Sequence, residues 1–279
     1  MYLDITEEKV KSALIKETKL SSILQRLGKV LVAYSGGVDS TYLLYFAKKT
    51  LDTNAQGIFA RGAMISETEE QEALNVAKEL GLDIKVVDMN IFAVKEFKEN
   101  PPDRCYYCKK KIFSSFNQVM LNQGCSAIVD GTNFSDSEDF RPGRKALQEI
   151  GVISPLRDAE MTKEDIRILS KLNGLPTWDK PSMACLASRI PYGDTITPEL
   201  LAQVGSAEQI LQGKGFIERR VRIHGDVARI EIPVSDFPIL LNIHEEIVDE
   251  FLKLGFRFIT LDLMGIRSGS LNPKEKTHE

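Results

Sequence analysis

The sequence predicts an α/β protein built on a doubly wound parallel sheet, followed by a smaller α+β domain at the C-terminal end. Three observations support this prediction. Short β-rich runs with apolar centres stand at residues 29–34, 55–60, 83–88 and 126–131, and helical stretches separate them. Such alternation is typical of parallel strands with helices on both faces. Beyond about residue 193 the order changes, with two adjacent strands in place of single alternating ones.

The helices follow from apolar spacing. The first, over 7–27, carries an apolar stripe of five residues, Val10, Leu14, Leu20, Ile23 and Leu27. Further helices are predicted between the strands, at 40–50, 67–80 and 105–122. Because ligands of doubly wound sheets bind beyond the carboxyl ends of the strands, the loops that follow the strands are where functional residues are expected.

A turn signal at Pro191, Tyr192 and Gly193 marks the expected domain boundary, and Pro198 begins the next helix. We therefore predict one domain over 1–193 and a second over 194–279. The second domain is expected to contain a helix at 198–212, strands at 218–225 and 227–233, a helix at 242–254 and a strand at 257–263.

Composition limits the classes of function. The 279 residues carry a net charge of -4, which disfavours a broad nucleic-acid surface. No apolar run approaches the roughly 18 residues that would suggest a membrane span. The N-terminal residues lack the apolar segment of a secretory signal, so a cytoplasmic, reducing setting is expected. In that setting a CxxC pair favours a metal or catalytic role over a structural disulfide.

The strongest local motif is LVAYSGGVDSTYLL, residues 31–44. An apolar strand runs into Ser35, Gly36 and Gly37, and a helix begins near Asp39 and Ser40. Two glycines allow a tight turn, so that backbone NH groups and serine hydroxyls can face an anion at the helix N-terminus. This is neither a Walker A loop nor a dinucleotide fingerprint. The segment SGGVDS matches the pyrophosphate loop of the PP-loop ATP pyrophosphatases, and Asp39 could position Mg²⁺ for the leaving pyrophosphate.

Four cysteines are present. Cys105 and Cys108 begin a helical run, where the helix end and nearby cations favour the thiolate. They could form a redox pair or half of a zinc site, but a structural zinc needs two further ligands. Cys185, among small residues and close to Arg189, has the setting of a nucleophile. With the CxxC pair it could instead hold three irons of a 4Fe-4S cluster. Cys125 begins an apolar strand and is expected to be a packing residue.

Five segments together resemble the LarE family, over nearly the whole chain: SGGVDS, PPDRCYYCKK, DGTNFSDSEDFRPGRKAL, KPSMACLASRIPYG and LDLMGIRSGSLN. This family makes pyridinium-3,5-bisthiocarboxylic acid mononucleotide for the nickel-pincer nucleotide cofactor. The resemblance implies a Rossmann-like PP-loop fold, and an ATP- and Mg²⁺-dependent sulfurtransferase. That enzyme would adenylylate a carboxylate of the biscarboxylic acid nucleotide and replace AMP by sulfur. The sulfur would come from Cys185 itself or, in a three-cysteine branch, from a sulfide source through a 4Fe-4S cluster on Cys105, Cys108 and Cys185.

The motifs and the resemblance give a set of expected site residues. Nucleotide-binding residues are Ala33, Ser35, Gly36, Gly37, Val38, Asp39, Ser40, Arg61, Asp130 and Asn133. The expected catalytic residues are Cys185 and Arg189. The Arg189 guanidinium could hold a phosphate or carboxylate bidentately. Substrate-binding residues are Arg220, Arg222 and Arg267; Arg220 and Arg222 are two apart on a strand and share a face. Glu138 and Glu208 are expected magnesium ligands.

The resemblance also implies a small-molecule nucleotide substrate and a homo-oligomer, hexamers included, with no nucleic acid or membrane partner. Three alternatives remain open. A PP-loop tRNA thiolase would usually carry zinc-ribbon cysteines or a strongly basic RNA face. A non-catalytic ATP-binding sensor would show no substrate-dependent pyrophosphate release. An amide-forming synthetase would need an ammonia source, and no glutaminase motif is visible.

Overall fold

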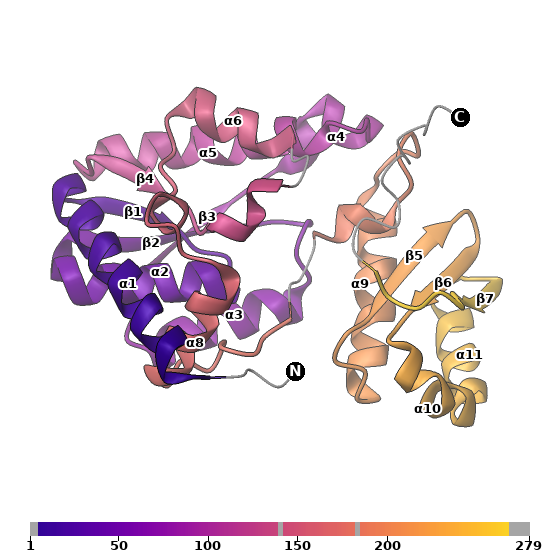
Figure 1. The fold of residues 1–279 in the computed structure, drawn as a ribbon. Helices are drawn as coiled ribbons and strands as arrows, with labels where there is room; N and C mark the ends of the chain where they lie inside the picture. The colour runs from indigo at the N-terminus through magenta and orange to yellow at the C-terminus, as the bar shows by residue number, and fades with distance from the viewer. Residues whose placement is uncertain (1–4, 139–141, 182–184, 268–279) are drawn as a thin grey trace, which may run out of the picture. The chain divides into compact units, whose positions relative to one another are not determined.

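The structure, a computed structural model, describes residues 5–138, 142–181 and 185–267 (Figure 1). Its backbone contacts divide the chain into two units. The first unit comprises Met1–Gly62, Glu67–Asn90 and Cys105–Met183. The second unit comprises Ala63–Ser66, Ile91–Arg104 and Ala184–Glu279.

The first unit contains a four-stranded parallel sheet, which confirms the predicted fold class. Its strands are β1 (Val30–Ala33), β2 (Ala55–Arg61), β3 (Ile84–Asp88) and β4 (Ala127–Val129). They pair in the order β3-β2-β1-β4. The strand order therefore reverses between β1 and β4. In open α/β sheets, this reversal point opens a crevice beyond the carboxyl ends of the two strands, and ligands bind there.

Helices cover both faces of this sheet (Figure 1). The helices are α1 (Glu7–Leu27), α2 (Val38–Leu51), α3 (Glu67–Glu79), α5 (Arg104–Asn122), α6 (Pro142–Ile150), α7 (Pro155–Asp158) and α8 (Lys163–Leu172), and single 3₁₀ turns lie at Asp52–Asn54 (η1) and Phe134–Glu138 (η3). On one face, Phe113 and Phe116 of α5 pack with Leu31, Ile58 and Cys125 in the core. Cys125 is therefore the packing residue that the sequence predicts, and burial raises the pKa of its thiol.

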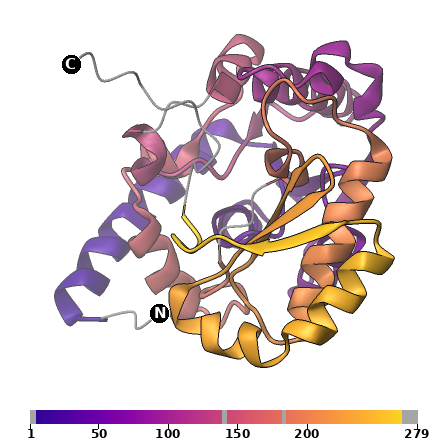
Figure 2. The ribbon, with the colours of Figure 1, turned by 90° about the vertical axis from the view of Figure 1, so that its right-hand side faces the viewer.

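The second unit contains a three-stranded sheet in the order β5-β6-β7 (Figure 2). Its elements are η2 (Ile91–Ala93), α4 (Lys95–Glu99), η4 (Leu186–Arg189), α9 (Pro198–Gly213), β5 (Arg220–His224), β6 (Val227–Glu231), η5 (Val234–Asp236), α10 (Phe237–Asn242), α11 (His244–Lys253) and β7 (Phe258–Leu261). β5 and β6 are antiparallel, and β7 is parallel to β6. Helix α9 packs on β5, and α11 packs on β7.

Buried Asn100 explains why an early segment belongs to the second unit. Its side-chain amide donates to the carbonyls of Pro191, at 2.6 Å, and Asp194, at 3.1 Å. The backbone carbonyl of Asn100 accepts from the Gly193 amide at 3.0 Å. The Arg104 guanidinium stacks over the Tyr192 ring, 4.8 Å from its centroid. These contacts join residues 91–104 to the segment that follows Cys185.

Candidate functional site

The SGGVDS loop connects β1 to α2 as the motif predicts. Ala33 ends β1, Gly36 adopts a φ of +71°, and Gly37 is the N-cap of α2. The Ser40 hydroxyl accepts from the Ser35 amide at 3.1 Å and lies 3.0 Å from the Ser35 hydroxyl. The helix N-terminus thus presents a closed, serine-lined turn at the carboxyl end of the central strand. Such a turn is suited to holding a phosphate.

The loop after β4 packs directly against this turn. A Cβ added to Gly131 would lie 2.9 Å from the Ser40 amide nitrogen, so only glycine permits this approach. Next to it, the buried Asp130 carboxylate accepts from the hydroxyls of Thr132, at 2.5 Å, and Ser154, at 2.6 Å. The phosphate loop and the β4 loop therefore meet where the strand order reverses.

Asp39 connects the two loops. Its Oδ1 accepts from the side-chain amide of buried Asn133 at 3.4 Å, and its Oδ2 accepts from the Lys163 ammonium. Burial raises the pKa of the Asp39 carboxyl, and the neighbouring Lys163 charge acts to lower it. Lys163 therefore favours the ionised form of Asp39, which is the form able to hold a cation.

Replacing Lys163 by Met should move the acidic limb of ATP-dependent pyrophosphate release to higher pH. Without the ammonium, the pKa of Asp39 rises further, so a larger fraction of the carboxyl is protonated at any acidic pH. The rate at neutral pH should fall about tenfold or more, because a charge-assisted hydrogen bond is lost. A pH–rate profile of both proteins measures this shift. K9M is the matched control. Lys9 pairs with Glu164, the residue after Lys163 in α8, but at an exposed site, so K9M should leave the profile unchanged.

Lys163 is a site residue that the sequence analysis missed. It is the first residue of α8, a helix that was not predicted. The signal was present: Thr162 and Asp165 form a capping box, in which the Thr162 hydroxyl accepts from the Asp165 amide at 3.2 Å. Thr-x-x-Asp before an apolar run indicates a helix start. The same helix carries Arg167, whose charge also acts on Asp39.

Arg61 ends β2, beyond which ligands are also expected. Its side chain is exposed, and its guanidinium pairs with Glu70 at 2.6 Å and with Asp88 at 3.5 Å. The hydrogen bond to Glu70 raises the pKa of the guanidinium. The structure thus places Arg61 at the expected strand end, where it contacts two acidic residues rather than the SGGVDS loop.

The cysteines fall into different units. Cys105 is exposed in the first turn of α5, and Cys108 lies one helical turn later. Both belong to the first unit, whereas Cys185, also exposed, is the N-cap of η4 in the second. Within the described part of the chain, no three His, Cys, Asp or Glu side chains form a group that could hold a metal ion. The structure therefore shows two thiols one helical turn apart in the first unit, and a third thiol in the second unit.

The two expected magnesium ligands also lie in different units. Glu138 ends η3 in the first unit, and its side chain lies outside the described residues. Glu208 lies on α9 in the second unit, with only 4% of its surface exposed. Its Oε1 accepts from Arg189 Nε at 2.5 Å and from the Val221 amide at 2.9 Å, and its Oε2 accepts from Arg189 at 3.1 Å. Both Glu208 oxygens thus contact donors within the protein.

The arginines of the second unit gather around β5. Arg222 is 4% exposed and pairs with Glu231, while Arg220 donates to the Arg267 carbonyl at 2.7 Å. The Arg267 guanidinium lies 3.5 Å from Asp262. Burial, and then the like charges of Arg189 and Arg222, lower the pKa of Arg220. An anion beside Arg220 would relieve this repulsion, so the cluster suits a phosphate or carboxylate.

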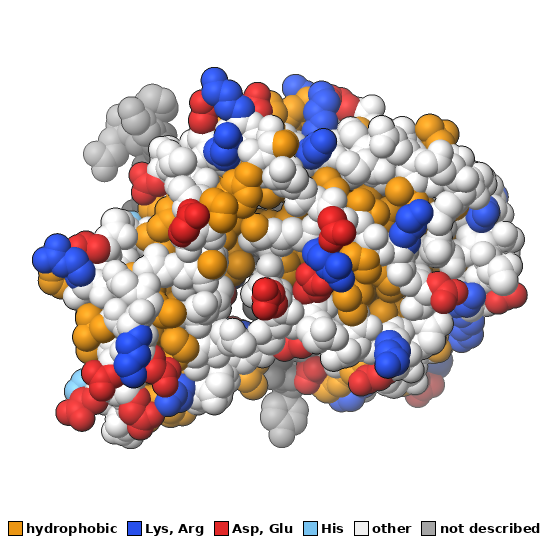
Figure 3. Space-filling model, turned by 180° about the vertical axis from the view of Figure 1, so that it is seen from behind, with side chains coloured by type: hydrophobic (Ala, Val, Ile, Leu, Met, Phe, Trp, Pro, Cys, Tyr) orange, Lys and Arg blue, Asp and Glu red, His pale blue; other side chains and the backbone are white. Residues whose placement is uncertain are grey.

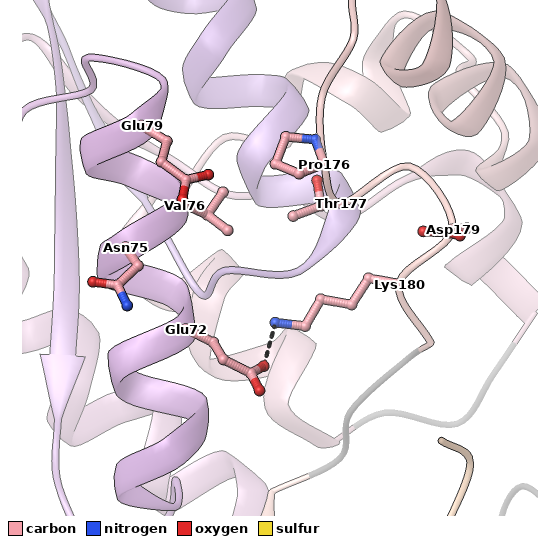
Figure 4. A pocket seen from close by; sticks show the side chains of 8 residues that line it. All are labelled: Glu72, Asn75, Val76, Glu79, Pro176, Thr177, Asp179 and Lys180. Atoms are coloured by element: carbon pink, nitrogen blue, oxygen red, sulfur yellow. Dashed lines mark hydrogen bonds and ion pairs between the residues drawn. The ribbon is translucent and has the colours of Figure 1, made fainter. Parts of the chain in front are cut away.

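The loop that leads towards Cys185 is anchored within the first unit. Arg167 donates to the carbonyls of Trp178, at 2.8 Å, and Lys180, at 3.0 Å. The Lys180 ammonium points to Glu72 of α3, 3.4 Å away, across a hollow of about 380 Å³ (Figure 4). This loop therefore has a fixed course as far as Lys180.

Surface charge on the face shown in Figure 3 is mixed. Lys and Arg side chains alternate there with Asp and Glu, and the described side chains form no continuous basic surface on that face. In the part of the chain that the structure describes, no helix is both long enough and apolar enough to span a membrane.

Comparisons with known proteins bear on this site. A family model described as NAD synthase matches residues 15–109, which include the SGGVDS loop. The pyridinium-3,5-bisthiocarboxylic acid mononucleotide synthase of Lactiplantibacillus plantarum is 38% identical over 92% of this chain and 94% of its own length. An uncharacterised protein of Synechocystis is 39% identical over 92% of this chain and 97% of its own. The glutamine-hydrolysing GMP synthase of Petrotoga mobilis is 23% identical over 57% of this chain and 35% of its own length.

A parallel sheet with a serine- and glycine-rich phosphate loop between β1 and α2 defines a PP-loop, ATP-dependent enzyme, and the NAD synthase match agrees with that class. Identity extends far beyond the phosphate loop, into both units. The chain belongs to the family of pyridinium-3,5-bisthiocarboxylic acid mononucleotide synthases, the LarE family.

Proposed function

We propose that this protein uses ATP to adenylylate a carboxylate of pyridinium-3,5-biscarboxylic acid mononucleotide, and then replaces AMP by sulfur. The product would serve nickel-pincer cofactor biosynthesis. The observation that carries the proposal is the Asp39–Asn133–Lys163 group beside the phosphate loop, at the reversal point of the sheet. Family membership supports the substrate class.

In the first half-reaction, a substrate carboxylate oxygen attacks the α-phosphorus of ATP, and the bond to the β-phosphate breaks. Pyrophosphate then leaves with the electron pair. The SGGVDS loop, with Ala33 at its base, would hold the phosphates through its amides and the Ser35 and Ser40 hydroxyls. Asp39 would hold Mg²⁺, which neutralises the leaving group. Asp130 and Arg61 would border the nucleotide from the neighbouring strand ends.

In the second half-reaction, a sulfur nucleophile attacks the carbonyl carbon of the acyl-adenylate, and AMP leaves. An acyl-adenylate is a far better electrophile than a carboxylate, which is why ATP is needed. We assign the nucleophilic position to Cys185, whose thiol is exposed. Arg220, with Arg222 and Arg267 beside it, would bind the substrate anions, because an anion relieves the repulsion that Arg220 experiences from the charges of Arg189 and Arg222.

The sulfur donor has two candidates. Cys185 itself would form a thioester as AMP leaves; loss of its Cα proton to solvent would then break its Cβ–S bond, releasing the thiocarboxylate and leaving dehydroalanine. Alternatively, the donor is a sulfide delivered from outside and bound to a 4Fe-4S cluster. Two thiols one helical turn apart, Cys105 and Cys108, fit two anchors of such a cluster, and Cys185 would be the third. A cluster would supply an open iron for the sulfide. The described residues include no preformed group of three metal-binding side chains.

The test is pyrophosphate release by the purified protein with ATP and Mg²⁺. Release should appear only when the biscarboxylate nucleotide is added, and a thiocarboxylate should form in the same sample. A second sample contains ammonia and xanthosine monophosphate in place of the biscarboxylate nucleotide, to test for an activity like that of GMP synthase. Pyrophosphate release with that pair, and none with the biscarboxylate nucleotide, would overturn the proposal.

A further inference from the structure

The backbone around Cys185 has a defined shape in the second unit. Cys185 caps η4, and its carbonyl accepts from the Ser188 amide at 2.8 Å. The Leu186 amide donates to the Met64 carbonyl at 3.1 Å, which ties the turn to a distant part of the sequence. The Cys185 thiol is exposed, whereas Leu186, Ala187 and Arg189 around it are buried. An exposed reactive group thus stands on a buried support.

Ser188 receives hydrogen bonds from two different arginines. Arg189 Nη1 donates to the Ser188 hydroxyl at 2.8 Å. Arg222 Nη1, from β5, donates to the Ser188 carbonyl at 2.7 Å. Together with its amide, which bonds to Cys185, Ser188 therefore uses its amide, its carbonyl and its hydroxyl in fixed contacts.

Each arginine is in turn held by a buried glutamate. Arg189, 1% exposed, pairs bidentately with Glu208. Arg222 pairs bidentately with Glu231, which is 0% exposed, at 2.7 and 3.0 Å. Bidentate Arg–carboxylate pairs fix the plane of the guanidinium as well as its position. The two pairs therefore aim their remaining nitrogens at one serine, three residues from the thiol.

We propose that Ser188 is a positioning residue for Cys185, and that the two buried pairs, Arg189–Glu208 and Arg222–Glu231, act through Ser188 to hold the thiol in place. This inference rests on the proposed function, in which Cys185 occupies the nucleophilic position. It gives Arg189 and Glu208 a role different from those expected from the sequence, because the two side chains pair with each other and Arg189 also donates to Ser188. Reacting groups need a support whose side chains are locked by further contacts.

Buried ion pairs add little net stability over apolar packing, so stability alone does not explain two of them at one residue. Their geometric effect is specific: each leaves one guanidinium nitrogen pointing at Ser188. A displacement of about 1 Å at a reacting centre can cost about a hundredfold in rate. Loss of the Ser188 hydroxyl contact should therefore affect sulfur transfer more than folding.

The test compares S188A with the unaltered full-length protein. In S188A, hydrogen exchange of the peptide covering residues 185–190 should become at least about tenfold faster, since a hydrogen bond to a charged group is lost. Thiocarboxylate formation should fall about 10- to 100-fold in kcat, with the KM for the nucleotide substrate unchanged. Pyrophosphate release should stay within about twofold, because the phosphate loop is in the first unit.

S188T keeps the hydroxyl and should restore both exchange and sulfur transfer, while S235A, at a serine bonded to Asp236 on an exposed turn, is the matched control. If S188A does not fold, S188T and S188V are compared instead, since they differ only by hydroxyl against methyl. Unchanged exchange and unchanged sulfur transfer in S188A overturn the proposal. If the unaltered protein itself makes no thiocarboxylate, the proposed function fails, and the exchange measurement still tests the positioning role.

Discussion

Changing Cys185 to Ala should lower the rate of thiocarboxylate formation by about a thousandfold or more, while substrate-dependent pyrophosphate release continues. The separation is expected because the two half-reactions use different residues. The phosphate loop and Asp39 belong to the first unit, and Cys185 belongs to the second. Pyrophosphate and thiocarboxylate measured in the same sample give both rates.

C105A, C108A and C125A decide how the sulfur reaches the acyl-adenylate. If Cys185 gives up its own sulfur, C105A and C108A remain active, and intact-mass spectrometry shows loss of the elements of hydrogen sulfide after turnover. If a cluster carries the sulfide, both variants lose activity, and anaerobic protein contains about four irons per chain. C125A is the control, since Cys125 packs in the core. Full thiocarboxylate formation by C185A would exclude Cys185 both as the sulfur donor and as a required cluster ligand.

The sheet and its phosphate loop could be predicted from the sequence because local signals determine them. Apolar runs of strand length, separated by amphipathic stretches, specify β1 to β4, and glycine at position 36 marks the one turn residue with a left-handed φ in the SGGVDS loop. These features depend on residues close in sequence. The three-stranded sheet of the second unit was predicted for the same reason.

The contact between Arg222 and Ser188 could not be predicted, since the two residues lie far apart in sequence. Arg222 and Arg220 share a strand face in the pattern, yet Arg222 pairs with Glu231 and bonds to Ser188, 34 positions earlier. Likewise, Asp39 meets Lys163 from a helix 124 positions later. Spacing reveals which side chains share a face of one strand; it does not reveal which counter-charge the fold brings to them.

Gly36→Ala should nearly eliminate ATP binding and lower the stability of the protein by about 2–5 kcal/mol. Two effects add. Gly36 has a φ of +71°, a conformation that costs an L-residue about 1–2 kcal/mol. An added Cβ would also overlap the Ala73 side chain and lie 2.9 Å from the Ala73 Cα, so the phosphate loop or α3 must move. Thermal unfolding and nucleotide titration measure the two losses.

The strain in G36A should reach the phosphate loop itself, because residues of that loop and the residue before it contact Ala73 of α3. Tyr34, just before the loop, donates its hydroxyl to the Ala73 carbonyl at 2.8 Å, and burial raises its pKa to about 12, so it remains a donor at ordinary pH. Gly36 and Tyr34 thus both contact Ala73, and moving α3 away disturbs the base of the phosphate turn. Gly213→Ala is the control, because its added Cβ meets nothing within 4 Å and its φ is not positive. If G36A bound ATP as tightly as G213A, the amides of this turn would not be the phosphate ligands.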